Sequence, residues 1–519
     1  MVNRSDSRQQ NEVAILGAGP AGLVVGRWLK ERGVPFVIFE AAADLGGQWN
    51  PEHPETATWP GMRTNTSRVM TSFSDLSYPH ETATYPSREE VHAYLHRYAE
   101  LFALHGHIRF DATITNVSRA NEGFELTVER HGSSETARYS RLIVATGRQR
   151  VGAIPAIEGL DGFCGTGGVH HTAAFEGASS FRGRRVLVAG CSISALEIAS
   201  DLANAGVDTT VCYRRQRYVL PKLLAGVPTD HVMFTRAACR AEETLPPDAA
   251  AAGLKAKVLS HAGRPDQWGA QMADPNILSA GITQSQGFLP AVAEGRIATR
   301  PWIDRVAGNS ITFTDGSADS FDAILFGTGY RHALPFFDAE TQRLLGLDEG
   351  RLELAHATFH PELPNVAFVG QYSLIGPFFP VVEQQARWVA DLFSRPVRAD
   401  ERDRHRAAFS ETVSVPPSVP MHLMAIAFAR LAGSEPDPEA WPSLKRALLF
   451  GPLTATSFRL SGPEAIPDAE ALVARDAAAF GAIETPVFTE DEAGLVAVLS
   501  ASADRADAAI DAPAAASAG

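Results

Sequence analysis

Short apolar runs alternate with helical patterns along the chain, and this order predicts an α/β fold. Residues 13–16 are apolar, and a glycine-rich turn and a helical stretch to about Arg32 follow them. Residues 34–40 form a second apolar run, of the length and composition typical of a buried strand. Strand, helix and strand in this order predict a parallel βαβ unit at the start of the chain.

The same order returns later in the chain. An apolar run begins near residue 185, a tight turn and a helical stretch follow, and a further apolar run covers 208–213. A second βαβ unit is therefore expected at 185–213.

The remaining segments supply further elements of both units. Ser87 and Glu90 form an S-x-x-E capping box, which predicts the start of a helix. Alternating runs at 108–117 and 123–129 predict a hairpin. Other strands are expected at 141–145, 310–314, 321–326 and 366–370, and a helix from about residue 382 to 393.

We expect two Rossmann-like dinucleotide-binding domains and a mainly helical C-terminal extension. The first domain is assigned to residues 1–160 and 320–395, and the second, inserted into it, to 161–319. Residues 215–300 are harder to assign and contain mixed helical segments with many Pro and Gly residues. The extension covers 396–500, and the low-complexity stretch 501–519 is expected to be disordered.

Composition and charge exclude several classes of protein. The chain has 519 residues, 45% of them hydrophobic, and a formal net charge of −14, which argues against nucleic acid or an anionic membrane as the main partner. Its four cysteines form no C-x-x-C motif, a pattern that suits the reducing cytoplasm. The N-terminus is polar and no apolar run reaches the length of a membrane span. We therefore expect a soluble, cytoplasmic protein.

The first glycine-rich turn has the spacing of a dinucleotide-binding loop. Gly17 permits the turn, Gly19 allows the backbone to approach a pyrophosphate, and Gly22 allows the helix to pack closely on the strand; Pro20 and Ala21 complete the loop. The N-terminus of the following helix stabilises negative charge. Glu40 ends the next strand, where an acid binds ribose hydroxyls. A glycine turn without a ligand is the alternative.

The second turn, GCSISA, leaves three interpretations open. Ser192 stands where a dinucleotide loop has its middle glycine, between Gly190 and the pair Ser194-Ala195. A G-x-S-x-small sequence after a strand is also typical of a hydrolase nucleophile. A Rossmann-like unit that has lost its ligand is the third interpretation. Arg214 and Arg215 follow the next strand where an NAD site has an acid, and two cations there favour the 2′-phosphate of NADPH.

Several motifs in order between residues 13 and 390 resemble the flavin-containing monooxygenases, which use FAD, NADPH and O2. They are GAGPAGL (17–23), GGQW (46–49), TNTSRVMTSFSD (64–75), YPSREEVHAYL (85–95), ATG (145–147), the GCSISA unit, GTGY (327–330) and EQQARW (383–388). The resemblance implies that further cofactor contacts come from Gly47, Gln48, Trp49, Thr64, Asn65, Thr66, Asp75, Val117, Thr146, Gly147, Gly329 and Gln385.

One family signature is distorted. Phe163, Gly165, His171 and Phe175 fit it only with two residues inserted before the histidine. We assign His171 a positional role in linking the domains; His170 and His171 as a solvated loop pair are the alternative. The other histidines show no metal-ligand spacing, so no metal is expected.

The resemblance implies oxygen transfer through a flavin hydroperoxide to a nucleophilic nitrogen or sulfur of a small substrate. The related Baeyer–Villiger enzymes, which attack ketones, carry an Asp where this sequence has Asn65 after Trp59-Pro60-Gly61. A neutral amide can donate a hydrogen bond to a peroxide or to NADP+ and a carboxylate cannot, so Asn65 is the expected catalytic residue, a plain turn residue being the alternative. Phe175-Glu176, in place of a Trp followed by Pro or Asp, also favours oxygen transfer to nitrogen or sulfur over ketone oxidation.

Three other functions are compatible with parts of this sequence. Baeyer–Villiger oxidation is the first alternative. A flavin disulfide reductase or electron-transfer flavoprotein has the same architecture and is the second alternative. A disulfide reductase, however, needs a redox-active cysteine pair, which the sequence lacks. A binding scaffold without chemistry has no positive support.

The extension is expected to cover the substrate entrance or a subunit interface, as in a homodimer.

Overall fold

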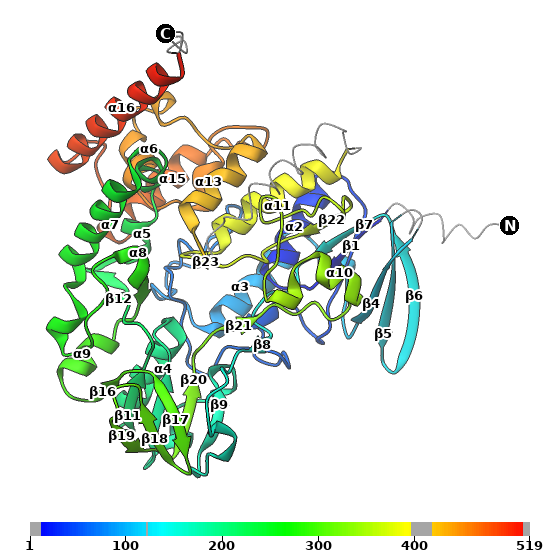
Figure 1. Ribbon diagram of the computed structural model, residues 1–519. Helices are drawn as coiled ribbons and strands as arrows, with labels where there is room; N and C mark the ends of the chain where they lie inside the picture. Colours follow the sequence, from blue (N-terminus) through cyan, green and yellow to red (C-terminus); the bar gives the residue numbers. More distant parts are fainter. Residues whose placement is uncertain (1–11, 121–122, 396–417, 512–519) are drawn as a thin grey trace, which may run out of the picture.

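The computed structural model describes residues 12–120, 123–395 and 418–511. Its described part has two five-stranded parallel sheets, each with its own helices, and a helical C-terminal part. In Figure 1 the first sheet lies to the right, the second sheet at the bottom, and the C-terminal helices at the top. The predicted fold class, two Rossmann-like units with a helical extension, is confirmed.

The first unit is built on a five-stranded parallel sheet of order β22-β7-β1-β2-β3. Its strands are β1 (Val13–Leu16), β2 (Phe36–Phe39), β3 (Ile108–Arg109), β7 (Arg141–Val144) and β22 (Val366–Phe368). Every residue of β1 and β2 is buried, because helices pack on one face of the sheet, and residues 117–139 and 334–363 pack on the other. The helices of this unit are α2 (Pro20–Glu31), α3 (Arg88–Leu101), α10 (Ala339–Leu344) and α11 (Phe379–Phe393).

An antiparallel sheet extends the first unit. It contains β4 (Thr113–Arg119), β5 (Phe124–Arg130) and β6 (Ser133–Tyr139). The predicted hairpin began at residue 108, but Ile108 and Arg109 pair with β2 of the parallel sheet instead. Ile108 is a buried member of the main core, and this long-range contact outweighs the local alternation.

The second unit is also built on a five-stranded parallel sheet, in the order β16-β11-β10-β20-β9, but its edge strand β9 precedes the central strand β10 in the chain. Its strands are β9 (Gly168–His171), β10 (Arg185–Ala189), β11 (Asp208–Cys212), β16 (Ile297–Arg300) and β20 (Ala323–Phe326), with helix α4 (Ile193–Asn204) and the small antiparallel sheet β17 (Ile303–Ala307), β18 (Ser310–Phe313) and β19 (Ala318–Ser320). The predicted division at 319/320 is wrong, because β20 pairs with β10 over Ala323–Phe326. The chain returns to the first unit only after Phe326.

Two short strands join the units. β8 (Val151–Gly152) lies where the chain leaves the first unit, and β21 (Tyr330–Arg331) lies where it returns. The two pair antiparallel. His171 Nε2 lies 2.9 Å from the carbonyl oxygen of Gly329, and its ring fills the place that a Cβ on Gly152 would need. His171 thus contacts both connections.

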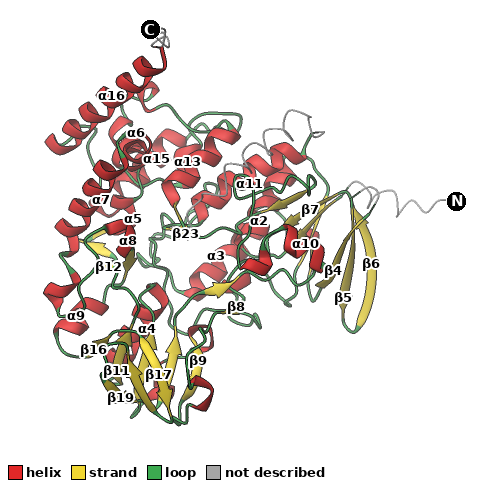
Figure 2. Ribbon diagram, viewed as in Figure 1, coloured by secondary structure: helices red, strands yellow, loops and turns green. Residues whose placement is uncertain are grey.

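Residues 215–300, which the sequence left open, contain short helices and strands. They are α5 (Thr229–Met233), α6 (Arg236–Thr244), α7 (Pro247–Ala262), α8 (Ile277–Ala280) and α9 (Phe288–Ala293), with β12 (Tyr218–Leu220), β13 (Leu223–Leu224), β14 (Val227–Pro228) and β15 (Ile282–Gln284). Figure 2 shows that these helices and those of the C-terminal part form one mainly helical region beside the sheets.

The C-terminal helices are α13 (Met421–Ala432), α14 (Lys445–Phe450), α15 (Ala469–Ala478) and α16 (Glu490–Asp511), and β24 (Val419–Pro420) pairs with β23 (Leu374–Ile375). Helix α13 packs on α11 of the first unit and on α6, and α16 also packs on α6. The extension therefore bridges the first unit and the 215–300 segment. Disorder was predicted for 501–519, but α16 continues to Asp511; residues 512–519 lie outside the described part of the chain.

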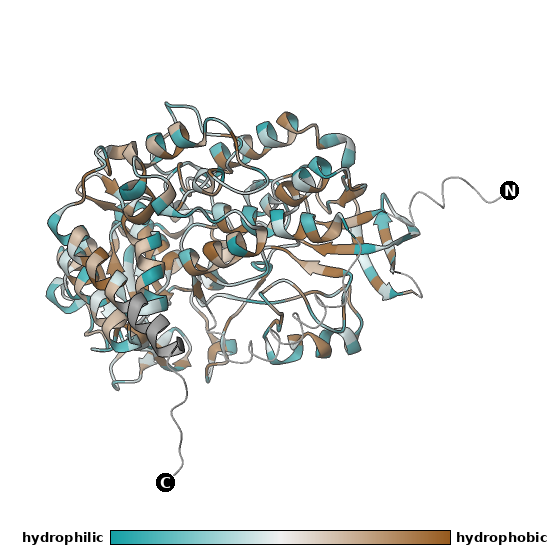
Figure 3. Ribbon diagram, turned by 90° about the horizontal axis from the view of Figure 1, so that it is seen from above, coloured by the Kyte–Doolittle hydropathy of each residue, from teal (hydrophilic) through white to brown (hydrophobic). Residues whose placement is uncertain are grey.

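Hydrophobic and hydrophilic residues alternate along many of the helices (Figure 3). The largest apolar cluster surrounds Trp28 of α2 and includes Trp388 of α11 and Phe428 of α13. Of the helices that the structure describes, none combines the length and apolar character required to cross a bilayer.

Candidate active site

One large cavity connects the two glycine-rich loops. Its volume is about 2240 Å³, and both the β1–α2 loop and the β10–α4 loop line it. Ligands of open α/β sheets bind at the carboxyl ends of the strands, where the strand order reverses, and both loops occupy such positions. The predicted residues that line the cavity are Gly17, Gly19, Pro20, Ala21, Glu40, Gly47, Gln48, Trp49, Thr64, Asn65, Thr66, Thr146, Gly147, Gly190, Ser192, Ser194, Arg214, Arg215 and Gly329.

Each glycine of the first loop occupies its position for a different physical reason. Gly17 has a φ of +105°, and a Cβ there would lie 2.7 Å from the carbonyl oxygen of Ala145. A Cβ on Gly22 would lie 1.9 Å from the carbonyl oxygen of Gly17, so the helix could not pack at its present distance. A Cβ on Gly19 would meet nothing closer than Gly47 Cα, at 3.6 Å. The protein itself tolerates a side chain at Gly19, which faces the cavity.

Glu40 holds the first loop in place. Its Oε2 accepts a hydrogen bond from Ala18 N at 2.7 Å, and its Oε1 accepts one from Ala42 N at 2.9 Å. His53 Nε2 lies 3.5 Å from Oε1, and His53 also lines the cavity. Glu40 is buried by the protein yet borders the cavity, so it orders the loop and remains within reach of a ligand hydroxyl.

Both loops open helices whose first N–H groups have no side-chain cap. Gly19 is the N-cap of α2 and Ser192 the N-cap of α4, and neither makes a side-chain capping bond. Both helices have 12 residues, so their N-termini concentrate positive potential at the cavity. Such ends fit phosphate groups.

The second loop keeps the close packing of a dinucleotide loop without its middle glycine. Gly190 has a φ of +142°, and a Cβ there would lie 2.5 Å from the carbonyl oxygen of Gly327. Ala195 is buried, and its Cβ would be 2.7 Å from a Cβ on Gly327. Among the described residues Ser192 Oγ has no hydrogen bond to a histidine or carboxylate, so the geometry of a hydrolase nucleophile is absent there.

Five predicted residues do not line the cavity: Gly22, Asp75, Val117, Ala195 and Gln385. Gly22 and Ala195 are packing positions. Val117 is buried, and its N–H donates to the carbonyl oxygen of Phe336. These positions support the loops without facing the cavity.

Asp75 and Gln385 have structural partners. Asp75 pairs with Arg27 Nε at 3.0 Å and with Arg459 Nη1 at 3.0 Å, which joins the first unit to the C-terminal part. Gln385 Oε1 accepts a hydrogen bond from Gly370 N at 2.9 Å, and its amide nitrogen donates to Phe368 O at 3.0 Å. Both side chains are thus used to hold the protein together, and neither reaches the cavity wall.

Arginines surround the cavity although the chain is acidic overall. Arg214 and Arg215 follow β11 as predicted, and Arg148 and Arg217 were missed. Burial lowers the pKa of Arg148 and of Arg217, and Arg148 Nε is buried without a hydrogen-bond partner. Arg148 directly follows the ATG motif at the end of β7, a position that could have identified it. Unpaired guanidinium donors at a cavity suit an anionic ligand.

Asn65 lies at the cavity in a firmly anchored loop. Thr64 Oγ1 donates to Thr66 O at 2.8 Å, and Lys222 Nζ lies 3.4 Å from Thr64 O and 2.7 Å from Glu197 Oε2 of the second unit. Asn65 Oδ1 is buried and has no hydrogen-bond partner in the protein. An amide held this way has hydrogen-bonding capacity left for a ligand.

A buried polar pair supports the same loop from the 215–300 segment. Asp230 Oδ2 accepts a hydrogen bond from Ser67 N at 2.6 Å, and His231 Nε2 lies 3.1 Å from Ser67 Oγ. Burial raises the pKa of Asp230 to about 7 and lowers that of His231 to about 3. Sequence reasoning missed both, because nothing in the local pattern brings them to Ser67.

Trp59 connects the loop before Asn65 to the second unit. Its Nε1 donates to Asp201 Oδ2 of α4 at 3.2 Å, and its ring packs edge-to-face on Phe175 at 5.9 Å.

The four cysteines, all within the described residues, are free, so the structure has no disulfide redox centre.

Comparison with known proteins agrees with this architecture. The family model for flavin-binding monooxygenase-like proteins matches residues 10–399. The N-oxide-forming dimethylaniline monooxygenase 2 of Rattus norvegicus is 25% identical over 485 residues, covering 87% of this chain and 89% of its own. The chain belongs to the flavin-binding monooxygenase-like family, and it is a flavin-dependent monooxygenase that uses O2 and a small-molecule substrate.

Solved structures share the fold. The S-allyl-L-cysteine S-oxygenase of Allium sativum superposes with a TM-score of 0.57 at 19% identity, covering 95% of this chain and 98% of its own. Cyclohexanone monooxygenase bound to ε-caprolactone superposes with a TM-score of 0.59 at 19% identity, covering 81% and 98%.

Proposed function

We propose that the first unit binds FAD, that the second binds NADPH, and that the enzyme transfers one oxygen atom of O2 to a nucleophilic nitrogen or sulfur atom. With the revised boundaries, the FAD unit comprises residues 1–160 and 328–395 and the NADPH unit 161–327. The observation that carries the proposal is one cavity shared by two uncapped helix N-termini, each following the central strand of a Rossmann-like sheet.

The residues of the first unit fit FAD. Gly19 leaves space for a pyrophosphate, the N-terminus of α2 stabilises its charge, and Glu40 is placed for a ribose hydroxyl. The GGQW turn faces the same space, since Gly47 lies against Gly19. Bound flavin supplies the activation of O2, and the surrounding protein excludes water.

The second unit fits NADPH better than NADH. Arg214 and Arg215 line the cavity after β11, where an NAD-specific site has an acid. Two guanidinium groups can bind a 2′-phosphate with paired, charge-assisted hydrogen bonds. Ser192 lines the cavity with a free hydroxyl and can donate one hydrogen bond to a phosphate oxygen.

Asn65 supports nitrogen or sulfur as the oxygen acceptor. Its amide is neutral and can both donate and accept, the residue lines the cavity, and its buried Oδ1 has no hydrogen-bond partner in the protein. A carboxylate at this position would accept only and would bring a negative charge. Ketone oxidation of the Baeyer–Villiger type is the second candidate, and transfer of electrons without oxygen insertion is the third. The free cysteines suit a cytoplasmic location.

The proposal is tested by mixing the flavin-loaded enzyme with NADPH without oxygen and then admitting air. We expect NADPH to bleach the flavin absorbance, and air to restore it with N-oxide or S-oxide formation from an added tertiary amine or thioether. Lactone formation from a cyclic ketone without amine or thioether oxidation would support the second candidate. Flavin that NADPH does not reduce would overturn the proposal.

A further inference from the structure

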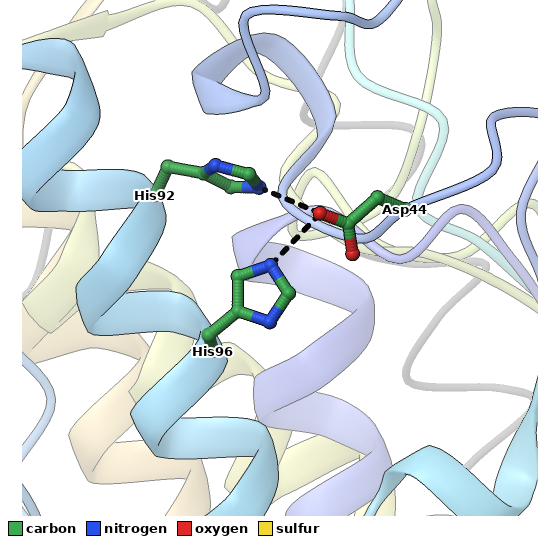
Figure 4. A group of neighbouring side chains, drawn as sticks. All are labelled: Asp44, His92 and His96. Atoms are coloured by element: carbon green, nitrogen blue, oxygen red, sulfur yellow. Dashed lines mark hydrogen bonds and ion pairs between the residues drawn. The ribbon is translucent and has the colours of Figure 1, made fainter.

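Three metal-ligating side chains converge outside the cavity. His92 and His96 lie on α3, and Asp44 lies in the loop before the GGQW turn (Figure 4). His96 Nε2 is 2.9 Å and His92 Nε2 is 3.4 Å from the same oxygen, Asp44 Oδ2. The three side chains are partly exposed, so an ion from solution can reach them.

Local structure preorganises this cluster. The capping box of Ser87 and Glu90 fixes the start of α3, and the four-residue spacing of the histidines places both rings on one face of the helix. Asp44 Oδ1 accepts a hydrogen bond from Leu45 N at 2.8 Å, which turns Oδ2 toward the rings. Gly46 has a φ of +112°, and a Cβ there would lie 2.7 Å from His92 Cδ2. The loop is therefore shaped around the His92 ring.

The ligand spacing fits a tetrahedral metal. Zinc binds imidazole nitrogen and carboxylate oxygen at roughly 2.0–2.2 Å, so neighbouring ligand atoms of a tetrahedral site lie about 3.3 Å apart. The two nitrogen-to-oxygen distances of 2.9 and 3.4 Å bracket this value. All three ligand atoms lie within 4.8 Å of one another. His92 Nε2 also lies 3.0 Å from the carbonyl oxygen of Leu45, so an ion bound to this nitrogen would replace that hydrogen bond, with water as the fourth ligand.

We propose that Asp44, His92 and His96 bind one divalent transition-metal ion of the zinc class. The ion connects the loop of residues 44–49 to α3. Because Gly46 N donates to the carbonyl oxygen of Ala18 and Gly47 lies against Gly19, the same connection steadies the first glycine-rich loop. This site is independent of the proposed function, since it needs neither NADPH nor substrate.

The expectation that the histidines lack metal-ligand spacing overlooked this pair. His92 and His96 are four residues apart in a helix that the sequence itself predicts. The third ligand comes from a loop 48 residues before His92, and only the folded chain brings it to the pair.

Metal binding is tested on the flavin-loaded protein after treatment with a chelator. Calorimetric titration with ZnCl2 should show one ion per chain and a higher unfolding temperature in excess zinc, since binding to the folded state stabilises it. His96→Gln and Asp44→Asn should each weaken binding more than about tenfold. His261→Gln, at an exposed histidine of α7, is the matched control and should bind as the wild type does.

Copper identifies the ligands directly. With one equivalent of Cu²⁺, electron paramagnetic resonance should show coupling to two imidazole nitrogens in the wild type and to one in His96→Gln. Circular dichroism and flavin content show whether each variant is folded. Zinc affinity that is unchanged in both folded variants, or no binding by the folded wild type, would mean that the cluster is only hydrogen-bonded and would overturn the proposal.

Discussion

Gly19 faces Gly47 across the mouth of the first loop, and a Cβ on Gly19 would lie 3.6 Å from Gly47 Cα, an ordinary contact. Gly22, three residues later, has no such space, because its Cβ would lie 1.9 Å from Gly17 O. Gly22 is thus required by the fold, whereas we propose that Gly19 is required by the cofactor of the cavity.

Gly19→Ala and Gly22→Ala should therefore fail in different ways. Gly19 has a φ of −75°, which alanine adopts freely, so Gly19→Ala should fold with near-normal stability but retain little flavin. Gly22→Ala should lose about 1–3 kcal/mol of stability through overpacking, even without cofactor. Urea unfolding of the cofactor-free proteins and the flavin-to-protein absorbance ratio measure the two effects. Full flavin content in Gly19→Ala would contradict this explanation.

Asn65→Asp should change the chemistry without unfolding the loop. The carboxylate has nearly the same shape, but it cannot donate a hydrogen bond and it adds negative charge at the cavity. We expect amine or thioether oxygenation to fall at least tenfold, and more NADPH to be consumed per product formed. Product yield and hydrogen peroxide release measure this coupling, and Asn116→Asp, on strand β4 away from the cavity wall, is the control. Unchanged coupling would remove Asn65 from the mechanism.

Arg214→Ser with Arg215→Ser should abolish the preference for NADPH. Each charge-assisted hydrogen bond contributes about 1.5–3 kcal/mol, so KM for NADPH should rise roughly ten- to a hundredfold or more while KM for NADH changes little. Steady-state kinetics with both cofactors measure the ratio. Arg182→Ser, an exposed arginine of the same unit, is the control and should leave the ratio unchanged. An equal rise for both cofactors would contradict recognition of the 2′-phosphate.

Ser192→Gly tests whether the departure from the glycine pattern matters. Ser192 makes no side-chain capping bond, so its removal leaves α4 intact. If the hydroxyl only occupies space, NADPH should bind equally or more tightly in Ser192→Gly. A large loss of affinity, measured by titration of the oxidised enzyme with NADP+, would show that the hydroxyl is itself a ligand.

The stability of the fold should depend on pH through Asp230. Burial raises the pKa of Asp230 to about 7, whereas an unfolded aspartate titrates near pH 4, so the folded chain holds the extra proton between these values. The free energy of unfolding contributed by Asp230 therefore falls as the pH rises from about 4 to 7. His231, whose pKa burial lowers to about 3, contributes the opposite slope between about pH 3 and 6.5.

Asp230→Asn isolates the first of these effects. The variant retains His231, so its stability relative to the wild type should rise between pH 5 and pH 8. Urea unfolding at both values measures the difference, and Asp304→Asn, at an exposed aspartate, is the control. A difference that does not change with pH would contradict a raised pKa at Asp230.

Features that depend on neighbouring residues can be predicted from the local sequence. The two βαβ units, the distinct roles of Gly17 and Gly22 and the capping box of Ser87 follow from short-range geometry, and the structure shows each of them. These features involve turns, helix ends and close approaches over a few residues, which local sequence encodes.

Contacts between side chains that are far apart in the sequence depend on the packing of the whole chain. Asp75 pairs with Arg459, 384 positions away, so it holds the C-terminal part instead of facing the cavity. The Ser67–Asp230 bond and the meeting of Asp44 with His96 likewise join separate elements. Each depends on how whole units pack, and the burial that this packing creates also sets the pKa of Asp230; no local pattern carries that information.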